Sequence, residues 1–199
     1  PLATEIITSE LTGRKSPVPD LKEKDIPYYG VKEAVFPFNM FPEVDPVLGP
    51  EMRSTGEVLG ISRSTGGAFY KAQEAAKMQL PLEGSVLITV SEQDRPYAPE
   101  IARRFHEAGF KILATEMTCK ANTQAGIPAV RVNKNYEGRP NILDLITNGQ
   151  IQMIVNTPVG KGARHDDSYL RKAAIKAKIP YVTTTAAGLA AAEGISHLK

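Results

Sequence analysis

Five short apolar runs between residues 86 and 185 each end in a hydroxyl, an amide or a lysine. Each run is rich in β-branched residues and is too short for a helix, so each is predicted to be a strand. This regular spacing constrains the fold more than any other feature of the sequence. The predicted strands cover residues 86–89, 111–115, 130–134, 153–157 and 181–185.

Segments with helical spacing lie between these strands and after the last one. Alternation of strands with helices predicts an α/β fold with a five-stranded parallel sheet and flanking helices. All strands of a parallel sheet point the same way, so their carboxyl ends share one edge, where such folds bind ligands. The polar residues that close the five runs are therefore expected to converge. The predicted helices cover residues 100–108, 118–124, 142–148, 167–178 and 188–193.

Composition places the chain among ordinary soluble globular proteins, with 42% hydrophobic and 23% charged residues in a length of 199. A net charge of +2 predicts no attraction to nucleic acid or membrane surfaces. Cys119 is the single cysteine, which excludes an internal disulfide and fits a reducing cytosol. No apolar run approaches the roughly 20 residues that span a bilayer, so a cytoplasmic location is expected.

The first 80 or so residues differ in character from the rest. Proline is frequent before residue 50 and opposes long regular elements, so an irregular segment is expected there. Helices are predicted at residues 2–11 and 67–78, and residues 80–84 make a natural linker before the first strand. Because the chain lacks an initial methionine and its first helix has apolar positions that need a partner, we interpret it as part of a longer protein.

Residues 37–58, which begin Pro-Phe-Asn-Met-Phe-Pro-Glu-Val-Asp-Pro, resemble the end of the carbamoyl phosphate synthetase large subunit. Residues 132–140 and the run Val155-Asn156-Thr157 are similar to motifs of the regulatory domain of that family. The resemblance covers nearly the whole chain. It implies that residues 1–80 are the C-terminal remnant of an ATP-grasp unit. Residues 84–199 would then be a complete methylglyoxal-synthase-like regulatory domain with a Rossmann-type three-layer fold.

The resemblance also implies a function. The family makes carbamoyl phosphate for pyrimidine and arginine biosynthesis with ATP, glutamine and Mg²⁺ or Mn²⁺, and its regulatory domain binds UMP, IMP or phosphoribosyl pyrophosphate. This part of the chain is expected to need no cofactor of its own and to have no synthetase activity. Its expected partners are the nucleotide effector, the remainder of the large subunit and the glutamine amidotransferase small subunit. Apolar positions in residues 2–11 and at Phe36, Phe38 and Phe41 would leave surface for self-association.

Thr118 and Lys134 are the first candidates for holding a phosphate. Thr118 lies near a predicted helix start, beside backbone N–H groups without helical partners, so it could cap the helix, bind an anion or do both. The resemblance implies that the matching threonines of the family hold the phosphate of the effector. It also implies that Lys134 is the main cation that binds this phosphate. Arg95 is the second cation, where the family has a lysine. Thr89 and Thr115 close the first two strands.

The remaining candidates follow the last two strands. Asn156 and Thr157 close the fourth strand. Asn156 is assigned to the sugar or base, together with Asp166, which could equally serve the start of the next helix. Lys161 lies in a glycine-flanked loop, a weak phosphate signal by itself. Pro158 and Val182 replace polar residues common in the family, which reduces the set of donors. The other candidates in this group are Thr183 and Thr184.

Two other functions stay open. Methylglyoxal synthase, a lyase of the same fold, needs a carboxylate base in the stretch that reads here Glu137-Gly138-Arg139-Pro140-Asn141, and an arginine cannot act as a base at neutral pH. Alternatively, the domain is a packing or oligomerisation module with a vestigial pocket, which is consistent with the departures at Pro158 and Val182.

Overall fold

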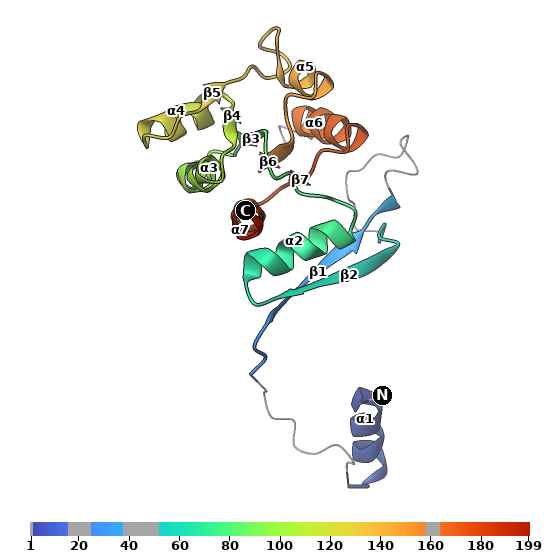
Figure 1. Ribbon diagram of the computed structural model, residues 1–199. Coiled ribbons are helices and arrows are strands. Elements are labelled where there is room, and N and C mark those ends of the chain that lie inside the picture. The colour runs from blue at the N-terminus through green and yellow to red at the C-terminus, as the bar shows by residue number, and fades with distance from the viewer. Residues whose placement is uncertain (1, 16–24, 38–51, 158–163) are drawn as a thin grey trace.

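A five-stranded parallel sheet forms the centre of the C-terminal part of the chain (Figure 1). The structure is a computed structural model that describes residues 2–15, 25–37, 52–157 and 164–199. Each hydrogen-bonded pair of neighbouring strands is parallel, as predicted from the alternating sequence. In spatial order the strands are β5 (Val130–Arg131), β4 (Lys111–Ala114), β3 (Ser85–Thr89), β6 (Met153–Asn156) and β7 (Tyr181–Val182).

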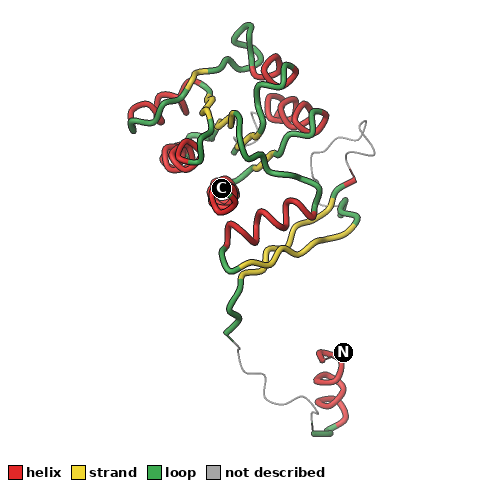
Figure 2. Tube along the Cα trace, viewed as in Figure 1, coloured by secondary structure: helices red, strands yellow, loops and turns green. Residues whose placement is uncertain are grey.

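Helices connect the strands and cover both faces of the sheet (Figure 2). A short 3₁₀ turn, η2 (Arg95–Tyr97), precedes the first of these helices. Four of these helices begin two or three residues earlier than predicted. At the two that begin at residues 116 and 185, Thr115 and Thr184 end the extended backbone and occupy the N-cap positions. The helices are α3 (Ala98–Glu107), α4 (Glu116–Gln124), α5 (Ile142–Thr147), α6 (Arg164–Lys176) and α7 (Thr185–Leu198).

The strands are apolar on both faces because both faces are buried, as is typical of parallel sheets. Alternate residues of β3 divide between two cores: Val86 and Ile88 pack in one and Leu87 in the other. The first core includes Ile101 and Phe105 of α3 and Ala191 and Ile195 of α7, and the second includes residues of α5 and α6. Among the described residues, no helix is both long and apolar enough to cross a membrane.

The N-terminal part contains an antiparallel hairpin that the sequence did not predict. Strand β1 (Tyr29–Val35) pairs with β2 (Gly56–Ser62), and α2 (Thr65–Ala75) packs against them. The expectation of an irregular segment is therefore wrong for these strands. Their alternation is interrupted by glycine and charged residues, and they pair across the proline-rich connection, most of which lies outside the described residues. Helix α1 (Leu2–Thr12) forms as predicted and lies apart from the rest (Figure 1).

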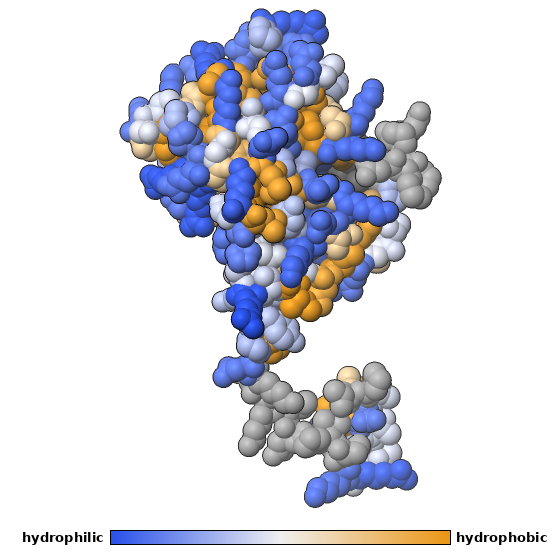
Figure 3. All heavy atoms as spheres, viewed as in Figure 1, coloured by the Kyte–Doolittle hydropathy of each residue, from blue (hydrophilic) through white to orange (hydrophobic). Residues whose placement is uncertain are grey.

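Exposed apolar side chains lie on the hairpin and on α1. Leu59 is 60% exposed and Ile61 44% exposed, and Figure 3 shows apolar residues gathered over the hairpin on one face of the molecule. On α1, Leu11 is 82% exposed. Phe36 instead lines a cavity, and Phe38 and Phe41 lie outside the described residues. These exposed side chains form an apolar surface of the kind that self-association needs. Self-association itself stays a prediction.

Helix α2 precedes the predicted domain boundary yet packs on α7. A Cβ added to Gly66 would lie 2.6 Å from the backbone nitrogen of Gly194, so the two helices approach more closely than any side chain would permit. The Gly66 N–H donates to Oε1 of Glu193 at 3.2 Å. Tyr70 of α2 is buried in the same core as α3 and α7. The hairpin and α2 therefore form a module that shares the core of the C-terminal domain.

Glu33 of β1 is half-buried and accepts a hydrogen bond from Nε2 of Gln73 at 2.8 Å. Desolvation raises the pKa of this carboxyl above its ordinary value of 4.5. A raised folded-state pKa means that folding favours the protonated carboxyl. The stability that the protonated carboxyl adds is present below pH 4.5 and is lost as the pH rises through the folded-state pKa.

Glu33→Gln should therefore raise the free energy of unfolding at pH 7, and the gain should shrink towards pH 4. Urea titrations at pH 4, 5.5 and 7 measure this, and a gain independent of pH would contradict it.

Candidate functional site

The carboxyl ends of β3, β4 and β6 border a cavity of about 360 Å³. The first turns of α4, the start of α5 and part of α6 complete its wall. We call it the carboxyl-edge cavity. Its position agrees with the edge predicted from the sequence. The predicted site residues that line it are Thr89, Arg95, Thr115, Thr118, Lys134, Asn156 and Thr157.

Threonine hydroxyls form the inner surface of the cavity. Oγ1 of Thr157 accepts a hydrogen bond from the Ser91 N–H at 2.8 Å, and Oγ1 of Thr118 accepts one from the Val90 N–H at 3.3 Å. Thr118 is only 1% exposed. A hydroxyl that accepts a bond from a backbone N–H keeps its own proton for donation. Both residues are therefore oriented by the backbone and retain a donor for a ligand.

The amino terminus of α4 lines the same cavity. Thr115 occupies the N-cap position, but its side chain makes no capping bond and lies 3.0 Å from Oγ1 of Thr89 instead. The first intrahelical bond comes from the Cys119 N–H, so the three preceding N–H groups have no helical partner. They carry the positive end of the helix dipole. Thr118 is the third residue of this helix, so the alternative in which it is the N-cap is wrong.

Two cations flank the cavity. Ser91 and Asp94 bond to each other through Oγ and Oδ2 at 2.8 Å and fix the loop that leads to Arg95. The Nε of Arg95 is buried without a hydrogen-bond partner in the described part of the chain, and its nearest carboxylate contact is Glu92 at 4.0 Å. Nζ of Lys134 lies 5.8 Å from the centre of the Tyr136 ring. Both side chains can accommodate an anion.

Two carboxylates of the cavity wall, those of Glu116 and Glu137, are engaged by other groups of the protein. Oε1 of Glu116 lies 2.9 Å from Nζ of Lys120, and Oε2 lies 3.5 Å from Arg131. The Lys120 hydrogen bond and the charge of Arg131 hold the pKa of Glu116 below its usual range. Glu137 accepts the backbone N–H of Lys134 at 3.0 Å. Paired in this way, these acids repel a bound anion less than free carboxylates would.

Comparison with known proteins assigns the domain to a family. The model of the MGS-like domain family matches residues 98–183. Residues 98–183 are an MGS-like domain. The sheet of this domain continues to β3, outside the matched range, and the carboxyl-edge cavity lies at its carboxyl end.

Relatives extend the match beyond the MGS-like domain. The chain is 55% identical over 170 residues to a carbamoyl phosphate synthase large chain from Gemmatimonas aurantiaca, covering 85% of this chain and 16% of the relative. It is 48% identical over 178 residues to the C-terminal section of the large chain from Aquifex aeolicus, covering 89% and 33%. A crystal structure of methylglyoxal synthase from Elizabethkingia anophelis matches with a TM-score of 0.43 and 16% identity, over 54% of this chain and 76% of that one.

These relatives confirm the resemblance to the end of the carbamoyl phosphate synthetase large subunit. The chain spans at most a third of the length of the two relatives above. In those relatives, the segment that matches this chain is therefore part of a much longer protein. The hairpin and α2 lie outside residues 98–183 but inside the segment that aligns with the relative from Aquifex aeolicus.

Two predicted site residues, Thr183 and Thr184, lie away from the carboxyl-edge cavity, and the side chains of two others are outside the described part of the chain. Thr183 lines a second cavity, beside the hairpin. Thr184 is the N-cap of α7, where its hydroxyl accepts the Ala187 N–H at 3.1 Å, rather than the end of a strand. Lys161 lies outside the described residues. Asp166 lies in the first turn of α6, and its side chain is outside the described part.

Other residues of the cavity wall are not among those predicted from the sequence, because they belong to helices and are not polar strand ends. Tyr169 and Leu170 of α6 and Leu143 of α5 border the cavity. Their signal was available, because the helix after β6 must start at the same edge as the strand ends. A ring such as that of Tyr169, 58% exposed, offers a flat apolar surface at the cavity.

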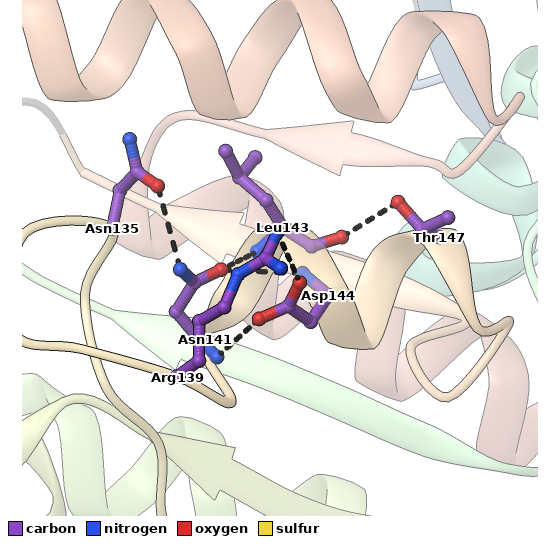
Figure 4. Close-up of polar contacts among 6 residues, drawn as sticks. All are labelled: Asn135, Arg139, Asn141, Leu143, Asp144 and Thr147. Atoms are coloured by element: carbon purple, nitrogen blue, oxygen red, sulfur yellow. Dashed lines mark hydrogen bonds and ion pairs between the residues drawn. The ribbon is translucent and has the colours of Figure 1, made fainter.

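Arg139, which stands where a lyase would need its base, does not line the cavity. Its guanidinium is 83% exposed and lies 3.2 Å from Oδ1 of Asp144 (Figure 4). Asp144 also accepts the N–H of Asn141 at 3.0 Å, and Asn141 caps α5 in return. The pair stabilises the start of α5. Among the described residues, no cluster of His, Cys, Asp or Glu could hold a metal ion.

Proposed function

We propose that the MGS-like domain binds the phosphate of a nucleotide effector in the carboxyl-edge cavity and thereby regulates a carbamoyl phosphate synthase. The observation that carries this proposal is the combination of an uncapped helix terminus, oriented threonine hydroxyls and an arginine with an unpaired buried nitrogen. Backbone N–H groups, hydroxyls and cations are the groups that bind phosphate best in proteins.

The nucleoside would extend from the phosphate towards α6. Asn156 offers an amide for ribose or base, and Tyr169 and Leu170 offer apolar surface for the base. A volume of about 360 Å³ lies in the range of small-molecule sites, about 300–1,000 Å³. By resemblance, UMP would inhibit, and IMP or phosphoribosyl pyrophosphate would activate.

Regulation requires that the effector bind two conformations of the protein with different affinity. Typical coupling free energies are about 1–3 kcal/mol, which changes an affinity about 5- to 150-fold. Helix α2, on which the hairpin packs, contributes Tyr70 to the core of the regulatory domain, so a shift in that domain has a physical path towards the ATP-grasp part. The proposed partners are the rest of the large chain and a glutamine amidotransferase subunit, with ATP and Mg²⁺ or Mn²⁺ bound in the full-length protein.

Isothermal titration calorimetry with UMP, IMP and phosphoribosyl pyrophosphate tests the proposal on the chain as it stands. At least one of them should bind, and uridine should bind at least tenfold more weakly than UMP because it lacks the phosphate. Thr118→Val, which removes the hydroxyl and keeps the volume, should weaken UMP binding about tenfold, as expected for loss of one hydrogen bond to a charged group. If no phosphorylated ligand binds at 1 mM, the domain is a packing module and the proposal is wrong.

A further inference from the structure

The hairpin and α2 contact the C-terminal part of the chain tightly at one end and loosely at the other. At the amino end of α2, Gly66 lies against Gly194 with no room for a side chain. At its carboxyl end, a second cavity of about 360 Å³ separates α2 and β1 from α6 and β7. We call it the junction cavity. A close backbone contact restricts translation, whereas an unfilled space permits movement, so the module can tilt about the glycine contact.

Tyr181 lines the junction cavity and contacts a residue that lines the carboxyl-edge cavity. Its hydroxyl accepts a hydrogen bond from Nδ2 of Asn156, an amide that lines the carboxyl-edge cavity. On the other side, the guanidinium of Arg171 lies 5.7 Å from the centre of the Tyr181 ring. Arg171 and Tyr181 both line the junction cavity. One side chain therefore contacts the proposed effector site and the wall that faces the hairpin.

Across the junction cavity lie Glu33 of β1 and Gln73 of α2, bonded to each other at 2.8 Å. Nε of Arg171 is buried without a hydrogen-bond partner in the described residues. Arg171 and Glu33 carry opposite charges and line facing walls of the cavity, so they attract each other. Any displacement of Arg171 therefore changes the force on the hairpin module.

We infer that Tyr181 couples occupancy of the carboxyl-edge cavity to the tilt of the hairpin module. A ligand that bonds to Asn156 changes the direction or strength of the Asn156 bond to the Tyr181 hydroxyl. The ring then shifts, and Arg171, which stacks on it, shifts with it. This inference rests on the proposed function, because it needs a ligand in the cavity.

The test is ¹H–¹⁵N NMR of the whole chain with saturating UMP. In the unmodified protein, UMP should shift the amide signals of Val90 and Thr118 in the cavity and those of Ala34 and Gln73 in the hairpin module. Tyr181→Phe keeps the ring and the stacking on Arg171 but removes the hydroxyl. In this variant the cavity shifts should persist, and the shifts of Ala34 and Gln73 should fall at least threefold.

Tyr28→Phe is the matched control, because it removes an exposed tyrosine hydroxyl from the hairpin side and should leave all four shifts intact. Tm within 3 °C of the unmodified protein would establish that Tyr181→Phe is folded. Equal shifts of Ala34 and Gln73 in Tyr181→Phe and the unmodified protein, with cavity shifts in both, would overturn the coupling alone. Absence of cavity shifts in the unmodified protein would overturn the proposed function and the coupling with it.

Discussion

Replacing Arg95 and Lys134 together by alanine should weaken UMP binding at least 100-fold. Each cation is positioned at the cavity and is free to bond to a phosphate oxygen. A hydrogen bond to a charged group contributes about 1.5–3 kcal/mol, and about 1.4 kcal/mol corresponds to a tenfold change in Kd. Two such losses therefore give at least two powers of ten. Calorimetry with UMP, at low and high salt, measures the effect.

The loss should be specific to the phosphate. Uridine binding should change less than threefold, and the dependence of UMP binding on ionic strength should decrease, because fewer charges contact the ligand. The control is Arg103→Ala with Lys176→Ala, which removes the same charge from exposed positions of α3 and α6 that do not line the cavity. If the Arg95 and Lys134 variant binds UMP within threefold of this control, the assignment of the phosphate site is wrong.

Gly60→Ala should lower the free energy of unfolding by about 2–3 kcal/mol, as overpacking of a tight contact does. A Cβ at residue 60 would lie 2.1 Å from the carbonyl oxygen of Ala68 and 2.4 Å from the backbone nitrogen of Ala72. Both are backbone atoms of α2, so no side chain can rotate away, and the helix must leave the hairpin. Because the chain has no tryptophan, urea unfolding is best followed by far-UV circular dichroism.

Gly56→Ala is a control in the same strand, because a Cβ there would meet nothing within 4 Å. Both substitutions reduce the entropy of the unfolded chain equally, an effect that by itself stabilises by about 0.4–1 kcal/mol. Gly56→Ala should thus be neutral or slightly stabilising, and only residue 60 should show the loss. Equal midpoints for the two variants would mean that α2 does not pack on β2 as described.

Local sequence determined the architecture of the five-stranded sheet and its helices. A short apolar run such as Met-Ile-Val at 153–155, which includes two β-branched residues, favours a buried strand. Helices between such strands favour a parallel sheet. Both signals depend on a few neighbouring residues. The edge that holds Thr89 and Asn156 follows from strand direction alone, so the sequence predicts their place in the cavity wall.

Only the tertiary structure decided which residues share the cavity and how the N-terminal part folds. Thr184 and Thr115 are both threonines near the end of a predicted strand. The hydroxyl of Thr184 nevertheless caps α7, whereas that of Thr115 contacts Thr89. The pairing of β1 with β2 joins residues across the long connection between them, and no local pattern specifies it. Contacts between distant segments, such as Tyr181 with Asn156 and Gly66 with Gly194, depend on how helices and strands pack. Periodicity reports which face of an element is buried, and packing determines what that face meets.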